Sequence, residues 1–208
     1  MELMFSKQRI ETLSDGIFAI VMTLLVLDLK VPLDVPAGQL AHTLLQEAPT
    51  WASFAITFIL AARYWTIQHR LFNLLEKIQP RTVVTTFIFL SLVTILPFST
   101  SLWGHYLNNP LAFFLYILNQ VLIGVVVLVE LLLARRGNNI RQGDNLWLLT
   151  GRLYVMVGSL LVSLVAATFL PTPYVGMIGA AAAVISRRLL QWLHKRYLKH
   201  HPELAEAQ

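Results

Sequence analysis

The stretch QRIETLSDGIFAIVMTLLVLDLKV, residues 8–31, decides the fold class of this chain. No charged residue lies between Asp15 and Asp28, and a helix that spans a membrane needs about 20 mostly apolar residues. The run has no small-x-small cleavage site and continues into Lys30 and Pro32, unlike a cleaved signal peptide. We therefore expect a retained transmembrane helix.

Five further apolar runs of similar length follow the first. They predict helices at about 48–72, 82–103, 111–134, 147–169 and 174–193, joined by short connections that contain Pro, Gly and Asn. We therefore predict an all-α, polytopic membrane protein with six transmembrane helices. Residues 1–208 are expected to form a single domain, with 194–208 as a short cytoplasmic tail.

The composition agrees with a chain that lies largely in lipid. Apolar residues make up 56% of the sequence and charged residues only 13%, and the mean hydropathy is +0.64. The chain has no cysteine, which excludes disulfides, thiolate metal sites and cysteine nucleophiles. The net charge of +5 comes from residues near helix ends, so it indicates topology and contact with lipid headgroups rather than nucleic acid.

Lys and Arg residues are concentrated in every second connection. Basic residues precede the first helix, follow the second and fourth helices, and continue into the C-terminus, whereas the other three connections hold only Lys30. Because cytoplasmic loops carry the excess of Lys and Arg, this pattern predicts that both termini are cytoplasmic.

The first helix has two different faces. At 100° per residue, its apolar side chains and one hydroxyl share a sector of about 100°: Ile20, Thr23, Leu24 and Leu27. Asp15 lies about 140° away on the same helical wheel, so the two faces serve different purposes. For an isolated membrane helix, an Ile and Leu face is most simply explained by lipid or core packing.

Asp15 needs a partner on another helix, because its neighbour four residues before is Glu11, a like charge. Trp65 and His69 are four residues apart near the same end of the second predicted helix, and they are plausible partners. A charged group at membrane depth is costly unless it is paired, which favours such a network. A helix cap or interfacial cluster without a role in transport is the alternative on the residues alone.

Arg9-x-x-x-Leu13-Ser14-Asp15-Gly16, followed by Ala19-Ile20, Thr23 and Leu27, resembles the first-helix signature of the transmembrane protein 175 potassium channel family. Trp65-x-x-x-His69 is similar to a second feature of that family. Leu13 replaces the usual phenylalanine. A single six-helix copy implies the bacterial form, located in the bacterial inner membrane and assembled as a homotetramer.

The resemblance implies a pore lined by four copies of the first helix. Ile20, Leu24 and Leu27 would form apolar rings, and Thr23 would form a hydroxyl ring that favours potassium. Arg9, Ser14 and Asp15 would join Trp65 and His69 in a network on the cytoplasmic side. The permeant ion would be K⁺, with no cofactor and no structural metal.

The chain lacks the Thr-Val-Gly-Tyr-Gly loop whose carbonyls replace hydration in other potassium channels. A narrow apolar ring acts instead by excluding water. We therefore expect a hydrophobic gate and only modest selectivity for K⁺ over Na⁺.

Two other function classes are considered. A secondary transporter of a cation or small solute is the main alternative, although that class favours inverted repeats and helices broken mid-membrane, which the sequence lacks. An intramembrane enzyme is not expected, because Gly-x-Ser-x-Gly and zinc-binding His patterns are absent.

Three further residues carry individual expectations. Arg63 is expected either to pair with Glu130 or to extend toward the inner interface. Pro97 is expected to kink the third helix near its outer end. Asp28 lies at the outer mouth, where it either raises the local cation concentration or is simply a solvated helix end.

Overall fold

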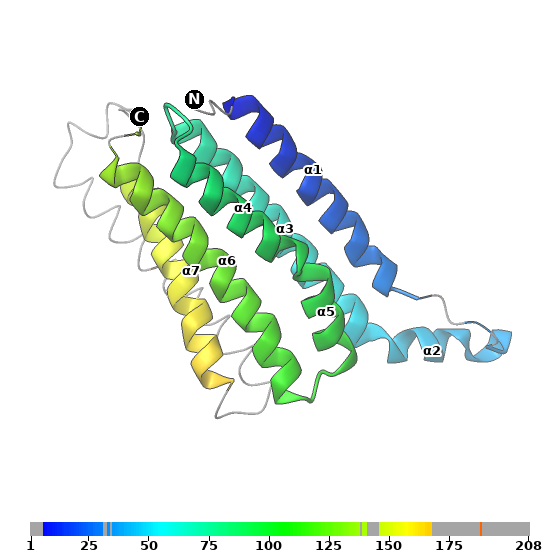
Figure 1. The fold of residues 1–208 in the computed structure, drawn as a ribbon. Coiled ribbons are helices and arrows are strands. Elements are labelled where there is room, and N and C mark those ends of the chain that lie inside the picture. The colour runs from blue at the N-terminus through cyan, green and yellow to red at the C-terminus, as the bar shows by residue number, and fades with distance from the viewer. Residues whose placement is uncertain are drawn as a thin grey trace.

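The computed structural model describes residues 6–30, 33, 35–137, 139–140, 146–167 and 188, with the backbone alone at 37, 146–149 and 152. Nine helical elements and no strand occur in these residues (Figure 1). They are α1 (Lys7–Leu25), η1 (Val26–Asp28), η2 (Ala37–Gln39), α2 (Leu40–Gln46), α3 (Ala48–Leu74), α4 (Pro80–Thr94), α5 (Leu96–His105), α6 (Pro110–Arg136) and α7 (Leu146–Ala166). The predicted all-α class is confirmed.

Within the part of the chain that the structure describes, three segments are long and apolar enough to cross a membrane: Lys7–Asp28, Pro80–His105 and Pro110–Arg136. Three helices begin at a residue that suits a helix start, because it either accepts a hydrogen bond from a backbone N–H of the first turn or has no N–H itself. Ser6 accepts from the backbone N–H of Arg9, and α4 and α6 each begin with a proline, which has no N–H to leave unpaired. The predicted helix 174–193 and the tail 194–208 lie outside the described residues, apart from Arg188.

The third predicted helix is divided into α4 and α5 at Ile95. Pro97 occupies the first turn of α5, where its missing N–H interrupts the ladder of helical hydrogen bonds. The kink expected from Pro97 is therefore present.

The connection between α1 and α3 contains the short helices η2 and α2, which the sequence analysis did not anticipate. Helix α2 has only seven residues, too few to stand out in a search for spanning segments. In Figure 1 it projects sideways from one end of the bundle, and none of its residues is buried.

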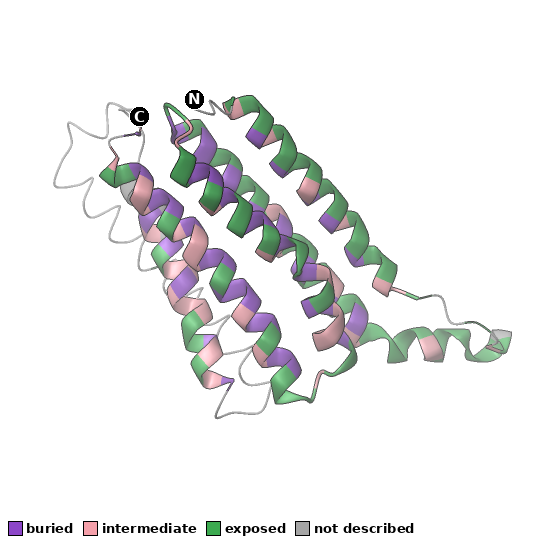
Figure 2. Cartoon of the chain, viewed as in Figure 1, coloured by how far each residue is buried: buried purple, intermediate pink, exposed green. Residues whose placement is uncertain are grey.

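The main core joins α1 to α3, α4 and α6. Phe18 and Val21 of α1 are almost fully buried, and the Phe18 ring lies 5.9 Å from the ring of Phe89 on α4. On the far side of α4 and α5 from α1, α6 packs against both of them and against α7. Helix α1 is therefore anchored through one face at the edge of the bundle (Figure 2).

The start of α1 meets the α3–α4 and α6–α7 connections at one end of the bundle. The Lys7 ammonium donates to the carbonyl of Leu75 at 3.2 Å, and Leu75 pairs with Ile140 in an isolated antiparallel bridge. The Asn139 side chain accepts from the backbone N–H of Lys77 at 3.0 Å and donates to its carbonyl at 2.6 Å. We call this the basic end, because Lys7, Lys77, Arg81, Arg135 and Arg136 lie on its segments.

Candidate functional site

Helix α1 has one packed face and one free face. The packed face carries Ile10, Ser14, Phe18, Val21 and Leu25, all buried against the bundle. On the free face, Ile20 is 59% exposed, Leu24 is 43% exposed and Leu27 is 70% exposed, and Thr23 is also exposed. The residues that the structure describes therefore leave uncovered the sector in which the sequence analysis grouped these four side chains.

The free face continues toward the basic end. Leu13 is exposed, and a Cβ added at Gly16 would meet no atom of the described residues within 4 Å. Leu13, Gly16, Ile20, Thr23 and Leu27 follow one another at alternating intervals of three and four residues. That spacing is typical of a helix face that meets another helix. We call these five residues, together with Leu24, the α1 stripe.

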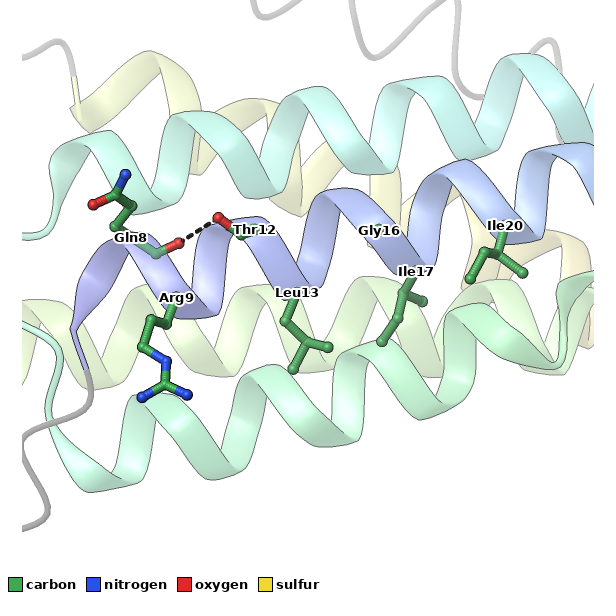
Figure 3. A pocket seen from close by; sticks show the side chains of 7 residues that line it. All are labelled: Gln8, Arg9, Thr12, Leu13, Gly16, Ile17 and Ile20. Carbon is green, nitrogen blue, oxygen red and sulfur yellow. Dashed lines mark hydrogen bonds between the residues drawn. The ribbon is translucent and has the colours of Figure 1, made fainter.

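An open groove of about 530 Å³ runs along the α1 stripe near the basic end. All of its lining residues belong to α1: Gln8, Arg9, Thr12, Leu13, Gly16, Ile17 and Ile20. Figure 3 shows that Arg9, Leu13, Ile17 and Ile20 project from the same side of the helix. Arg9 is thus the charged residue at the basic end of an otherwise mostly apolar surface.

Asp15 lies on a different side of α1 and contacts α3. The Trp65 indole Nε1 donates to Asp15 Oδ1 at 2.8 Å, and the Trp65 ring stacks on the His69 ring at 5.8 Å between centroids. His69 Nε2 lies 3.1 Å from the Asn73 side-chain nitrogen. The structure therefore brings Asp15, Trp65 and His69 together, and adds Asn73, which the sequence analysis missed although it follows His69 by one helical turn.

Among the described residues, Arg9 and Ser14 do not take part in those contacts. Ser14 is only 3% exposed and lies on the packed face of α1, whereas Arg9 is exposed at the groove. Residues within one short motif therefore occupy three sides of the same helix, which sequence spacing alone does not reveal.

The expected pairing of Arg63 with Glu130 is absent from the described residues. Glu130 is 2% exposed, and its carboxylate accepts from the Thr86 hydroxyl at 2.7 Å and from the Gln68 amide at 3.3 Å. Arg63 is exposed, because it lies off the line of buried residues Tyr64, Gln68 and Leu71 that α3 turns toward the core. The carboxylate is thus held by neutral donors from α3 and α4.

Further polar contacts lie inside the bundle, between α3, α5 and α6. The Tyr64 hydroxyl donates to the Gln120 carbonyl oxygen at 2.8 Å, and the Thr57 and Tyr116 hydroxyls are 3.1 Å apart. Thr100 of α5 donates to Thr57 at 3.1 Å. The polar positions of α3 recur at helical spacing, a signal that the sequence analysis did not use.

At the end opposite the basic end, Asp28 is not simply solvated. The Ser101 hydroxyl donates to Asp28 Oδ1 at 2.8 Å, and His105 Nδ1 lies 3.7 Å from Asp28 Oδ2. Among the described residues, no group of three or more His, Asp or Glu side chains forms a candidate metal site.

These faces of α1 and α3 lie within the part of the chain that known proteins share. Residues 9–97 match the family model described as "Endosomal/lysosomal potassium channel TMEM175". The chain is 33% identical over 140 residues to a protein of Chamaesiphon minutus named as a potassium channel, covering 66% of this chain and 68% of that relative. The chain belongs to the TMEM175 family.

Two further comparisons agree with this family assignment. A Streptomyces collinus protein named as a potassium channel is 32% identical over 104 residues, which is half of each chain. The crystal structure of a "lysosomal potassium-selective channel TMEM175 homolog" from Chamaesiphon minutus superposes with a TM-score of 0.74 at 26% identity, covering 88% of this chain and 97% of that one. The TMEM175 family and these relatives are ion channels rather than enzymes.

Proposed function

We propose that this chain is a potassium-permeable cation channel with modest selectivity for K⁺ over Na⁺, and that four copies assemble around a pore lined by α1. The observation that carries the proposal is the α1 stripe. It is a continuous face that the described residues leave uncovered, on a helix whose other face is packed into the bundle, within the segment that matches the family model. We infer that the permeant ion is K⁺, because the relatives are named as potassium channels.

The apolar side chains of the stripe suit a hydrophobic gate. Ile20, Leu24 and Leu27 are exposed and succeed one another over two helical turns. Repeated by four-fold symmetry, they form rings without oxygen ligands, and a narrow ring of this kind stops ions by dewetting. A small widening of the bore then restores conduction.

Thr23 supplies the one hydroxyl of this segment. Its Oγ1 donates to the backbone carbonyl of Ile20 at 2.7 Å, so the hydroxyl hydrogen is directed back into the helix. The oxygen lone pairs then face away from the backbone, where they suit a cation rather than an anion. Four such oxygens replace only part of a hydration shell, which favours the less strongly hydrated K⁺ modestly.

The network of Asp15, Trp65 and His69 anchors α1 to α3 beside the proposed pore. Ser14 contributes by packing on the buried face, and Arg9, which lines the groove beside the α1 stripe, stands at the pore entrance. In this proposal K⁺ binds only transiently as it permeates, and conduction requires no cofactor and no structural metal.

The concentration of Lys and Arg at the basic end supports a cytoplasmic location for that end and for both termini. We propose that the chain is a single six-helix domain in the inner membrane of a bacterial cell. Its partners are three further copies of itself and the surrounding lipid.

Potassium flux from liposomes that contain only the purified chain tests the proposal. Flux down a K⁺ gradient without a coupled solute is expected, and Ile20→Ala is expected to raise it because the bore widens. Ile59→Ala is the matched control, since Ile59 is 61% exposed but lies on α3. Saturating, proton-coupled uptake of a solute would instead support a secondary transporter, and equal flux for both variants would remove Ile20 from the gate.

A further inference from the structure

The end of α1 opposite the basic end is joined to α5 by three side chains. Asp28 is the last residue of η1 and directly follows Leu27 of the α1 stripe. Ser101 and His105 are four residues apart on α5, so they lie on the same side of that helix. Both reach the Asp28 carboxylate, Ser101 through a 2.8 Å hydrogen bond and His105 at 3.7 Å.

The two contacts respond differently to protons. The Ser101 hydroxyl donates to Asp28 whatever the charge of the histidine. His105 Nδ1 also lies 2.9 Å from the Ser101 carbonyl, which holds the ring beside Asp28 when Nδ1 carries a hydrogen. A charged imidazolium adds a Coulombic attraction to the carboxylate, and histidine is the side chain that ordinarily gains this charge between about pH 8 and about pH 5.

Solvent protons can reach this pair while the pair stays partly shielded. The side chain of His105 is 43% exposed and that of Asp28 is 23% exposed. Glu47, which directly precedes α3, lines the same outer groove as His105 and Tyr106, and Lys30 lies two residues after Asp28 in the chain. The first turn of α6 that borders this groove carries no charged residue.

We propose that Asp28, Ser101 and His105 form a proton-dependent latch that holds the outer end of α1 against α5. This inference rests on the proposed function for its effect on conduction. The buried face of α1 lies opposite the α1 stripe, and α1 contacts α5. A stronger latch therefore draws Leu27 away from the four-fold axis. Acid on this side of the membrane therefore widens the outer ring and raises K⁺ conductance.

The test is K⁺ conductance in lipid bilayers, with the pH of the solution facing the outer end lowered from about 8 to about 5. The wild-type chain is expected to conduct about two- to fivefold better in acid, as befits a partly exposed ion pair. Asp28→Asn keeps an acceptor for Ser101 but loses the charge, and His105→Asn cannot be protonated. Both are expected to lose the response, whereas His42→Asn, on exposed α2, keeps it.

A second measurement separates the latch from the channel function. The thermal midpoint of the purified protein in detergent is compared for wild type and His105→Asn over the same pH range. A wild-type advantage that grows toward acid pH supports the latch even if no K⁺ flux is found, in which case only the proposed function fails. An acid response that survives in both His105→Asn and Asp28→Asn, or a pH-independent stability difference, overturns the latch.

Discussion

The indole of Trp65 donates to the Asp15 carboxylate at 2.8 Å and so joins α1 to α3 on a different side of α1 from the groove at the basic end. A hydrogen bond to an ionised acceptor is among the stronger contacts available to a side chain. The Trp65 ring is also stacked on His69, so the donor is held in place from the other side. This contact fixes the basic end of the proposed pore helix.

Trp65→Phe is expected to lower the free energy of unfolding by about 0.5–1.5 kcal/mol, because it removes the donor and keeps most of the ring. The loss is expected to be small because Trp65 is 40% exposed. Thermal denaturation in detergent measures it. Trp51→Phe is the control, since Trp51 is 48% exposed at the other end of α3. Equal losses for the two variants would deny Trp65 an anchoring role.

Thr23→Ala is expected to reduce the preference for K⁺ over Na⁺, because it removes the hydroxyl oxygens from the stripe. Thr23→Ser keeps that oxygen and is expected to keep the preference. Reversal potentials under bi-ionic conditions measure both. Thr66→Ala is the matched control, as Thr66 of α3 is exposed and bonds its own helix in a similar way, through the Ala62 carbonyl at 2.8 Å. An unchanged reversal potential in Thr23→Ala would assign selectivity to other residues.

Leu27→Ala is expected to raise the conductance severalfold, because shortening the most exposed leucine of the stripe enlarges the outer ring. Single-channel recording measures the change. Val84→Ala on α4 offers a comparison at 59% exposure, away from α1. Wild-type conductance in both Leu27→Ala and Ile20→Ala would place the constriction elsewhere.

Thr86→Val is expected to destabilise the bundle by about 1–3 kcal/mol, because Glu130 loses its shortest hydrogen bond while it stays buried. Denaturation in detergent measures this. Thr85→Val is the control, since Thr85 bonds only backbone carbonyls of its own helix. A Thr86→Val protein as stable as Thr85→Val would mean that Gln68 alone supports the carboxylate.

Hydropathy was sufficient to predict the long helices of the described residues, because length and lipid exposure are properties of local sequence. It did not reveal α2, which is too short to cross a membrane. The Asp15 contact with Trp65 was predictable, because a carboxylate at membrane depth needs a hydrogen-bond donor. Trp65 and His69 lie near the same end of the next predicted helix and can supply one. Of the two expectations for Arg63, the pairing with Glu130 was wrong, because opposite charge does not reveal which side of α3 Arg63 occupies.

Some residues of the candidate site could be predicted from local sequence, and others could not. The helical wheel was enough to group Ile20, Thr23, Leu24 and Leu27 on one face, because periodicity is local. The contacts of Asp28 with Ser101 and His105 join positions more than 70 residues apart in the chain, and only the folded arrangement of α1 and α5 brings them together.

The contact between Asp15 and Trp65 also gives α1 a fulcrum. Leu27 lies 12 residues beyond Asp15, about 18 Å along the helix at 1.5 Å per residue. A tilt of one degree about that point moves the far end by about 0.3 Å, so a few degrees displace Leu27 by about 1 Å. Leverage of this kind converts a small rigid-body rotation into a large relative change in a narrow bore, and it needs no unwinding of the helix.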